Sequence, residues 1–398
     1  MTRRIAILGS TGSIGKNALR VIDVLGPEYQ VVALSGHTQV QLLAEQTRRY
    51  RPKVVTVTGA DHARLLRGMV EDLDVDVLTG PEGLVRMVQR DDVDVVLCAV
   101  VGAAGLPAVL AAATCGKRLA IANKEPLVVA GQLLTETAKA HGSTILPVDS
   151  EHSAIFQALQ AGRHEEVQRI ILTGSGGPFR KARPADLRQV TREQAMAHPV
   201  WAMGPKITID SATMMNKALE IIEARWLFDA PADRIEVLIH PESIVHSLVE
   251  FVDGSMIAQM GHPDMVLPIQ YALTFPQRIK GLSKRLQLEE IGRLTFESPN
   301  VETFRALSLA YQVARTGGTA PAVFNAANEA AVEAFLSGAI GFARIVELIE
   351  ACLDKHVVQT RAALEDLMEA DTWAREEVHS RIKDQNAKIK NTIVMFDS

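Results

Sequence analysis

The most constraining feature of the sequence is an alternation, from the start of the chain to Asp149, of short aliphatic runs with segments long enough to form helices. Parallel strands need a crossover connection of about helix length, so this rhythm predicts an α/β fold with a doubly wound, Rossmann-like parallel sheet. The expected strands are Ile5–Leu8, Val31–Leu34, Val54–Val57, Val75–Leu78, Val93–Ala99, Leu119–Ala122 and Thr144–Pro147.

After residue 150 the rhythm changes to a mixture of strands and helices, which predicts a second, α+β domain. Asp253-Gly254 supplies the positive φ angles of a tight turn and predicts an antiparallel hairpin. The expected elements are strands at Ile170–Thr173 and Val237–His240, a helix from about Ser211 to Trp226, and hairpin strands at Ile244–Val252 and Ser255–Met260.

Turn residues and mixed composition over residues 276–300 predict a linker, and helical periodicity beyond it predicts a helical domain over 301–398. Residues 384–398 show no clean periodicity, so we expect a frayed or partly disordered end and assign no function to it. The expected C-terminal helices are Phe304–Arg315, Pro321–Leu336, Phe342–Leu353 and Leu364–Ile382.

Composition narrows the class of protein. The formal net charge is −5, with basic residues scattered among acids, so no basic face for nucleic acid is expected. Cys98, Cys115 and Cys352 lack metal-ligand spacing, which favours a reducing, cytoplasmic compartment. The short apolar run before Gly9 does not resemble a signal peptide.

The uncharged stretch 95–116 is interrupted by glycines and a proline, and we interpret it as a buried strand, a turn and a helix rather than a membrane span.

A glycine-rich segment, Gly9-Ser10-Thr11-Gly12-Ser13-Ile14-Gly15, follows the first strand and opens a helix. Small residues there let backbone N–H groups approach a pyrophosphate at the helix N-terminus, which favours nucleotide binding over an ordinary turn. The second strand ends in Leu34-Ser35-Gly36-His37-Thr38-Gln39, without the acid that NAD sites use. NADP is therefore favoured, and His37, Thr38 and Gln39 are candidates for its 2′-phosphate.

Acidic residues predict a divalent metal site. Asp149 and Glu151 follow a strand at the carboxyl edge of the sheet, where ligands of such folds bind. Glu220 shares a helical face with Asn216 and Lys217. Oxygen ligands of this kind suit Mg²⁺ or Mn²⁺, although each acid alone reads as a solvated charge or a helix cap.

Other segments predict phosphate binding and a lid. The turn Thr173–Pro178 contains Ser175 among glycines and can wrap a phosphate, and Ser211 opens a predicted helix, where an N-cap is the plain alternative. The loop His198–Gly204 combines a histidine, Trp201 and glycine, which suits a lid over substrate, although Trp201 suits a packed core as well.

These segments together resemble one family, 1-deoxy-D-xylulose 5-phosphate (DXP) reductoisomerase, from about residue 4 to 380. The strings that carry the resemblance are Gly9–Gly15, Ala122–Glu125, PVDSEH from Pro147, LTGSGGPF from Leu172, DSATMMNK from Asp210, EARWLF from Glu223, LIHPESIVHS from Leu238 and NAANE from Asn325.

The resemblance implies an NADPH-binding domain (1–150), a catalytic metal- and substrate-binding domain with a dimerising sheet (151–275), a linker (276–300) and a helical domain (301–398). It implies a homodimer that rearranges and reduces DXP to 2-C-methyl-D-erythritol 4-phosphate (MEP), with NADPH and Mn²⁺, Mg²⁺ or Co²⁺, in the non-mevalonate isoprenoid pathway.

Matched residue by residue, the family's sites fall on three sets in this chain. The implied metal ligands are Asp149, Glu151 and Glu220, which with Lys124 form the catalytic set. The implied substrate contacts are Lys124, Ser150, Glu151, Ser175, His198, Ser211, Asn216, Lys217 and Glu220. The implied cofactor contacts are Thr11, Gly12, Ser13, Ile14, Gly36, Gln39, Asn123, Glu125 and Gly204.

The chain departs from the family pattern after the second strand, where His37-Thr38-Gln39 replaces the Gly-Lys-Asn or Gly-Ser-Asn of many relatives. Two alternatives stay open at this point. A semialdehyde-dehydrogenase-like enzyme would need a mid-chain cysteine nucleophile, and none lies between Cys115 and Cys352. A non-catalytic NADP(H) sensor would need the glycine turn but not the carboxylates.

Overall fold

The computed structural model describes residues 2–198 and 203–396, with side chains up to residue 384. The chain divides into two compact units, each packed mainly within itself. The first comprises residues 1–127, 131–167 and 246–290, and the second comprises 128–130, 168–245 and 291–398. The division into four segments made from the sequence remains a prediction.

The first unit contains a seven-stranded parallel sheet in the order β4-β3-β2-β1-β5-β6-β7. All seven strands predicted from the sequence are present, with ends shifted by a few residues at most. The strands are β1 (Arg3–Leu8), β2 (Tyr29–Gly36), β3 (Val54–Val57), β4 (Asp76–Thr79), β5 (Val95–Cys98), β6 (Arg118–Ile121) and β7 (Thr144–Pro147).

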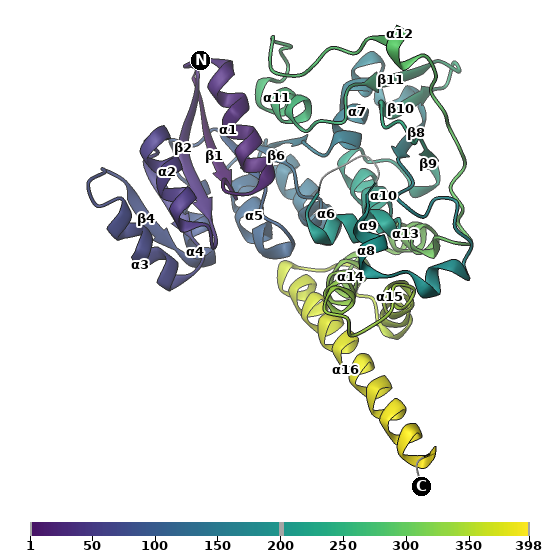
Figure 1. The fold of residues 1–398 in the computed structure, drawn as a ribbon. Coiled ribbons are helices and arrows are strands. Elements are labelled where there is room, and N and C mark those ends of the chain that lie inside the picture. The colour runs from purple at the N-terminus through teal and green to yellow at the C-terminus, as the bar shows by residue number, and fades with distance from the viewer. Residues whose placement is uncertain (1, 199–202, 397–398) are drawn as a thin grey trace. The chain divides into compact units, whose positions relative to one another are not determined.

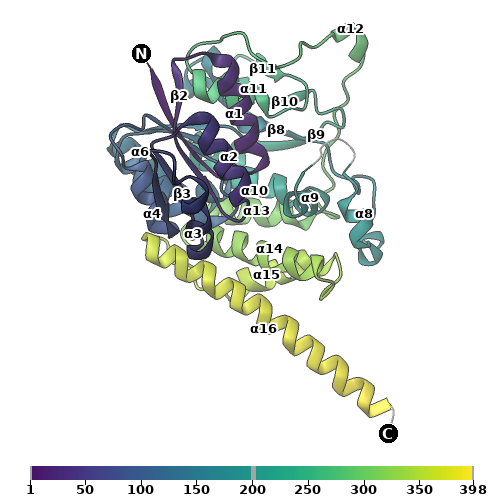
Figure 2. The same ribbon diagram turned by 60° about the vertical axis from the view of Figure 1, so that its left-hand side comes forward.

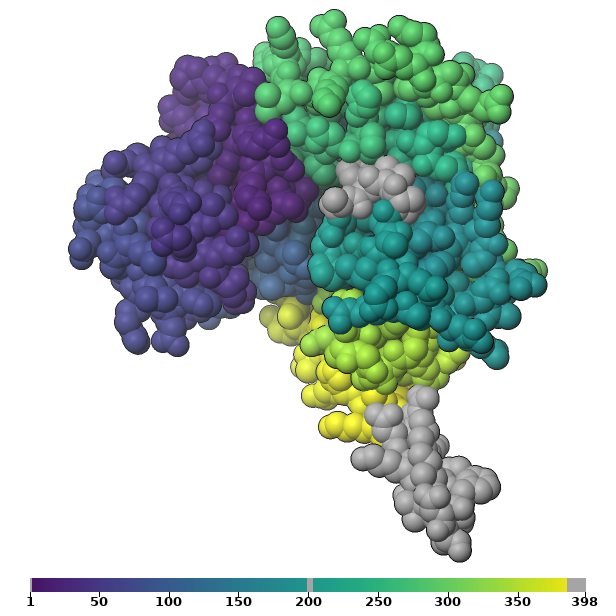
Figure 3. All heavy atoms as spheres, in the orientation of Figure 1, coloured from purple at the N-terminus to yellow at the C-terminus, as the bar shows by residue number. Residues whose placement is uncertain are grey.

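Helices cover both faces of this sheet (Figure 1). One face packs against α1 (Ser13–Leu25), α2 (Val40–Tyr50) and α3 (Ala60–Met69), and their buried aliphatic side chains form one core with Ile5 and Ile7 of β1. The connections after β4 run through α4 (Gly80–Val88), α5 (Leu106–Thr114) and α6 (Glu125–Ala140). Figure 3 shows the heavy atoms of the N-terminal segments, in purple and blue, from the side seen in Figure 1.

The strand order reverses at β1, which lies between β2 and β5. Ligands of open α/β sheets bind outside the carboxyl ends of the strands at such a switch point. The glycine-rich segment follows β1 directly and therefore lies where a ligand is expected. The uncharged stretch 95–116 forms β5, a short turn and α5, as predicted, and none of the helices among the described residues is long and apolar enough to cross a membrane.

A second, four-stranded sheet has the order β11-β10-β8-β9. The hairpin predicted at Asp253-Gly254 is confirmed: Gly254 has a φ of 84°, and Phe251 N–H donates to Ser255 O at 2.9 Å. Helices α7 (Ser150–Ala158) and α11 (Val266–Thr274) belong to the first unit. The strands are β8 (Val167–Gly174), β9 (Ile235–Ile239), β10 (Val245–Phe251) and β11 (Met256–Met260).

The single helix predicted from Ser211 to Trp226 is wrong. The structure has two helices, α9 (Pro205–Ala212) and α10 (Met215–Leu227), separated by Met214 in the left-handed conformation with a φ of 60°. The Thr213 hydroxyl accepts a hydrogen bond from Met215 N–H at 3.3 Å and so serves the start of α10. The segment contains neither Gly nor Pro at the break, so no residue type in the sequence signals it.

The C-terminal helices are α13 (Arg305–Thr316), α14 (Ala320–Leu336), α15 (Arg344–Lys355) and α16 (Leu364–Phe396), and α14 packs against both α15 and α16. Figures 1 and 2 show α16 continuing past the other two helices to the C-terminus. The backbone of α16 stays helical to Phe396, beyond the end at Ile382 that the sequence predicts for this helix. Between Phe275 and Arg305 the described backbone contains one short helix, α12 (Leu288–Ile291).

Candidate active site

The glycine turn after β1 leaves no room for side chains at two of its positions. A Cβ at Gly9 would lie 2.6 Å from Ala99 O, and Gly9 has a φ of +85°. A Cβ at Gly15 would lie 2.3 Å from Gly9 O. Gly12, by contrast, has space at 3.5 Å and is exposed at the start of α1. The outer glycines therefore fold the turn, whereas Gly12 leaves its outer surface open to a ligand.

Hydrogen bonds hold this turn against β2 and α2. Gly9 N–H donates to Ser35 Oγ at 3.0 Å, and Ser10 N–H donates to Ser35 O at 2.8 Å. The Ser10 hydroxyl donates to the Gln46 side chain at 2.7 Å, and the Gln46 amide donates to Ser10 O at 3.0 Å. Helix α1 has no side-chain cap, so its first N–H groups and its dipole are available to an anion such as a pyrophosphate.

The end of β2 borders the same turn. A Cβ at Gly36 would lie 3.5 Å from Thr11 Oγ1, and the Gln39 amide donates to Thr11 O at 3.4 Å. Thr11 is buried, while Gly12 and Ser13 are exposed and Ile14 is half-buried. The structure thus brings the predicted cofactor residues at the ends of β1 and β2 together.

A second group of predicted residues follows β6 and β7. Asn123 donates from its amide to Val100 O, and Glu125 is buried in the first turn of α6. Lys124 is only 7% exposed, and its Nζ lies 2.6 Å from Asp149 Oδ2. A buried ammonium group paired with a carboxylate is held in one place.

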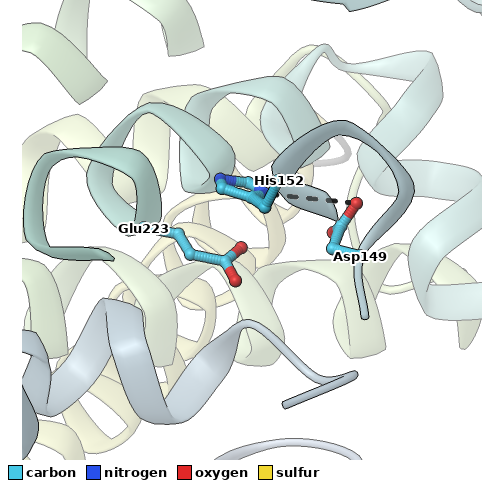
Figure 4. Close-up of side chains that lie close together, drawn as sticks. All are labelled: Asp149, His152 and Glu223. Carbon is cyan, nitrogen blue, oxygen red and sulfur yellow. Dashed lines mark ion pairs between the residues drawn. The ribbon is translucent and has the colours of Figure 1, made fainter. Parts of the chain in front are cut away.

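Asp149 immediately precedes α7, and Ser150, Glu151 and His152 form its first turn. Ser150 Oγ donates to Glu151 Oε2 at 2.6 Å. His152 is fully buried, with Nδ1 4.0 Å from Asp149 Oδ1, as Figure 4 shows. Burial acts to raise the pKa of Asp149, but the charges of Lys124 and His152 act against it and bring this pKa well below its ordinary range. Asp149 is therefore ionised, which is the form that binds a metal.

In the second unit, the loop after β8 is a tightly packed glycine turn. A Cβ at Gly174 would lie 2.9 Å from Lys217 Cε, and a Cβ at Gly177 would lie 2.6 Å from Ser211 O. Ser175 Oγ lies between them in sequence and accepts from Gly177 N–H at 3.3 Å. These close approaches bring Ser175, Ser211 and Lys217 together, although they come from three elements. Hydroxyl, ammonium and amide donors in one place suit a phosphate.

Helix α10 carries the other predicted residues of this unit on one face. Asn216 Nδ2 donates to Glu220 Oε1 at 2.6 Å, and Lys217 Nζ pairs with Glu220 Oε2. Glu220 is fully buried and Lys217 is 4% exposed. Figure 4 also labels Glu223, one turn further along α10, which is equally buried. A carboxylate held by two donors inside the protein keeps its orientation, as a metal ligand requires.

His198, at the start of the predicted lid, lies beside Ser175, one of the residues that suit a phosphate. Its Nε2 lies 3.3 Å from Ser175 Oγ, and burial lowers the pKa of its ring, which favours the neutral form. Trp201 lies outside the described residues. Met203 and Gly204 are described, and Gly204 is the exposed N-cap of α9.

Sequence reasoning missed several buried polar residues beside these groups. His152 and Glu223 lie three residues after Asp149 and Glu220, so helical spacing alone could have indicated them. Asp210, next to Ser211, is 1% exposed and accepts a hydrogen bond from Asn328 of α14 at 2.9 Å. Nothing local signals that contact, because the two residues are 118 positions apart.

Comparison with known proteins identifies the family. Sequence models described as 1-deoxy-D-xylulose 5-phosphate reductoisomerase match residues 5–131 and, for two C-terminal domains, 145–228 and 260–377. The DXP reductoisomerase of Symbiobacterium thermophilum is 52% identical over 380 residues, which cover 94% of this chain and 98% of that protein. The chain belongs to the DXP reductoisomerase family. The DXP reductoisomerase of Pelodictyon phaeoclathratiforme is 49% identical over 374 residues, or 94% of this chain and 98% of the relative.

Solved structures of this family share the fold along the whole chain. DXP reductoisomerase from Zymomonas mobilis in complex with NADPH is 42% identical, with a TM-score of 0.90 over 96% of this chain and 99% of that one. A DOX-P reductoisomerase in complex with NADPH, fosmidomycin and magnesium is 42% identical, with a TM-score of 0.91 over 96% of this chain and 98% of that one.

Proposed function

We propose that the polar residues described above carry out the reaction of the DXP reductoisomerase family in this chain. That reaction converts DXP to MEP with NADPH and Mg²⁺ or another divalent metal, which makes the chain an NADPH-dependent oxidoreductase. The observation that carries the assignment of residues is the packing of Gly174 against Lys217 and of Gly177 against Ser211, because it gathers phosphate-binding groups from separate elements.

NADPH fits the turn after β1. Because Gly9 and Gly15 have no side chains, the backbone packs closely at this turn, where a Cβ would collide with it. Helix α1 has no side-chain cap, so its first N–H groups are available to an anion. The nicotinamide supplies the hydride when it is bound. The residues that we assign to the cofactor are Thr11, Gly12, Ser13, Ile14, Gly36, Gln39, Asn123, Glu125 and Gly204.

A divalent metal fits the carboxylates. We assign Asp149, Glu151 and Glu220 as its ligands, because carboxylate oxygens are the donors that Mg²⁺, Mn²⁺ and Co²⁺ accept and Asp149 is ionised. The metal supplies Lewis-acid stabilisation of negative charge on substrate oxygens. Hydrogen bonds from Ser150 to Glu151 and from Asn216 to Glu220 orient the ligand oxygens.

Lys124 is assigned to the reacting end of the substrate. Its pairing with Asp149 at 2.6 Å holds Nζ beside a metal ligand, where a positive charge stabilises the oxyanion that develops during rearrangement and reduction. Burial excludes water from this ammonium group and strengthens its field.

The phosphate end of the substrate is assigned to Ser175, His198, Ser211, Asn216 and Lys217. Lys217 supplies the fixed positive charge, and the others supply hydrogen-bond donors. Binding energy from this nonreacting phosphate orients the carbon skeleton for the chemical steps.

The experiment is loss of NADPH absorbance with DXP, run with Mn²⁺ or Mg²⁺ and again after chelation. Metal-dependent oxidation that needs DXP is expected. A folded, NADPH-binding protein without such oxidation would favour an NADP(H) sensor instead. The semialdehyde-dehydrogenase alternative has no support, because residues 116–351 contain no cysteine nucleophile.

We also infer a homodimer that pairs through the sheet edge at β11. This strand is last in its sheet, and its residues Met256 and Ile257 are 47% and 37% exposed. An exposed apolar edge strand is a template for pairing with another chain. Light scattering is expected to give about twice the 43.3 kDa chain mass. The bond from Phe251 N–H to Ser255 O sets the alternation of the hairpin, so the Ala258 N–H points to the free edge, and Ala258→Pro is expected to give the monomer. A monomeric wild type would refute the inference.

A cytoplasmic location completes the proposal. The three cysteines form no disulfide in the described structure, as a reducing compartment requires. Fractionation of the native host, followed by an activity assay of each fraction, tests this location, and activity confined to a non-cytoplasmic fraction would contradict it.

A further inference from the structure

The loops that follow β2 and β3, together with the first turns of α2 and α3, contain two histidines and no lysine or arginine. His37 comes directly after Gly36, and His62 lies in the first turn of α3. From Ser35 to Thr47 and from Thr58 to Ala63 the sequence has no other side chain that can carry positive charge. An NADP site at this sheet edge needs a positive partner for the 2′-phosphate, and these segments supply no arginine for it. The next arginine along α3, Arg64, pairs with Asp61.

The two histidines lie together in the structure. Their ring centroids are 6.1 Å apart, and the rings meet edge to face at 87°. Pairing of β2 with β3 places Gly36 opposite Val57, so the two loops leave the sheet side by side. A phosphate carries three terminal acceptor oxygens, so one phosphate can accept hydrogen bonds from two neighbouring rings.

In each ring Nδ1 is the nitrogen that contacts the protein. His37 Nδ1 is hydrogen-bonded to the Thr58 hydroxyl. His62 Nδ1 is buried against the turn at Gly59, where a Cβ would lie 3.0 Å from it. The Nε2 atoms are therefore the ones available to a ligand, and an Nε2–H group is a hydrogen-bond donor.

The surroundings favour an anion at this place. Gly36 and Gln39 contact Thr11 of the glycine turn, so the loop after β2 borders the proposed cofactor site. Helices α2 and α3 both begin here without a side-chain cap, and their N-termini carry partial positive charge. The nearby acid, Asp61, pairs with Arg64 at 3.8 Å, which offsets its charge.

We propose that His37 and His62 together bind the 2′-phosphate of NADPH and determine the preference of this chain for NADPH over NADH. The inference rests on the proposed cofactor site. It extends that site to His62, on a separate element, and gives the replacement of the family's Gly-Lys-Asn or Gly-Ser-Asn a function: a pair of histidines takes the place of a longer basic side chain.

The test measures the dissociation constants of NADPH and NADH directly, by fluorescence of the bound nicotinamide without substrate. His37→Ala and His62→Ala are each expected to weaken NADPH about tenfold, the size of one charge-assisted hydrogen bond, and the double variant about a hundredfold. NADH, which lacks the phosphate, is expected to bind all variants equally. His37→Arg is expected to keep the NADPH preference.

His141→Ala is the matched control, because His141 is an exposed histidine of the same unit at the end of α6. Equal weakening of NADPH and NADH in the double variant would overturn the proposal and assign the rings to adenosine packing or to folding. An unchanged NADPH constant would overturn it as well. Failure of the proposed function is distinguishable, since wild-type protein would then not oxidise NADPH with DXP, whereas the dissociation constants are measured without substrate.

Discussion

At the scale of single residues, hydrogen bonds, ion pairs and close packing hold the side chains of the proposed site in position. Glu220 is held by an amide and an ammonium group, Lys124 by a carboxylate, and Ser175 by a turn that admits no side chain at Gly177. These contacts can be tested by substitutions that keep the volume of the side chain or that have a matched control at another position.

Glu220→Gln removes the charge of a proposed metal ligand while keeping its size. Because loss of groups that merely orient ligands costs about 10- to 100-fold, we expect turnover to fall about a hundredfold or more. The buried Lys217 loses its charge partner, so the melting temperature is expected to fall as well, and turnover is compared on protein shown to be folded. The measurement is turnover at saturating metal and DXP. Turnover close to that of wild type would remove Glu220 from the ligand set.

Gly177→Ala places a methyl group 2.6 Å from Ser211 O at a φ of +63°. The loop must shift, so we expect KM for DXP to rise about tenfold or more. Gly338→Ala is the control, because Gly338 also has a positive φ of 82° but nothing within 4 Å of its Cβ position. This control is expected to lose about 1 kcal/mol of stability and to keep KM unchanged. A similar KM in both variants would contradict the close packing.

At the scale of elements, α9 follows the predicted lid in the chain, carries one of the proposed phosphate-binding residues, and is held in place by α14. Asp210 of α9 is almost fully buried between Lys206, at 2.7 Å, and Asn328 of α14. A buried carboxylate requires such partners, since an unsatisfied one is costly. The NAANE string therefore supports the site from a helix that contributes no proposed ligand.

Asn328→Leu removes one partner of Asp210 without changing the volume greatly. We expect a loss of about 1 to 3 kcal/mol in the free energy of unfolding, measured by urea denaturation. Adding Asp210→Asn removes the buried charge, so the double variant is expected to lose less than the sum of the two single changes. Strict additivity would show that the two side chains do not interact.

At the scale of the whole molecule, two of the three cysteine thiols are buried within the units and one is exposed. Cys98 and Cys352 are buried, and burial raises their pKa values to about 12 and about 11, whereas Cys115 is exposed. Raised pKa values leave these two thiols protonated and unreactive at pH 8, since the thiolate is the nucleophile.

Labelling with a thiol-specific disulfide reagent at pH 8 is accordingly expected to modify one thiol quickly in the folded protein and three after denaturation. Cys115→Ser is expected to abolish the fast reaction. Rapid modification of two or three thiols in the native state would show that one of the units opens readily under these conditions.

The sequence predicts the seven strands of the parallel sheet, the hairpin, the C-terminal helices and the family. These features depend on local periodicity, turn residues and long matching strings. The break at Met214, the contact of Asn328 with Asp210 and the pairing of His37 with His62 became visible only in the folded chain. Local patterns report which residues prefer a helix or a strand. They carry no information on which distant side chains share a buried space, because packing and the need to satisfy buried polar groups decide that.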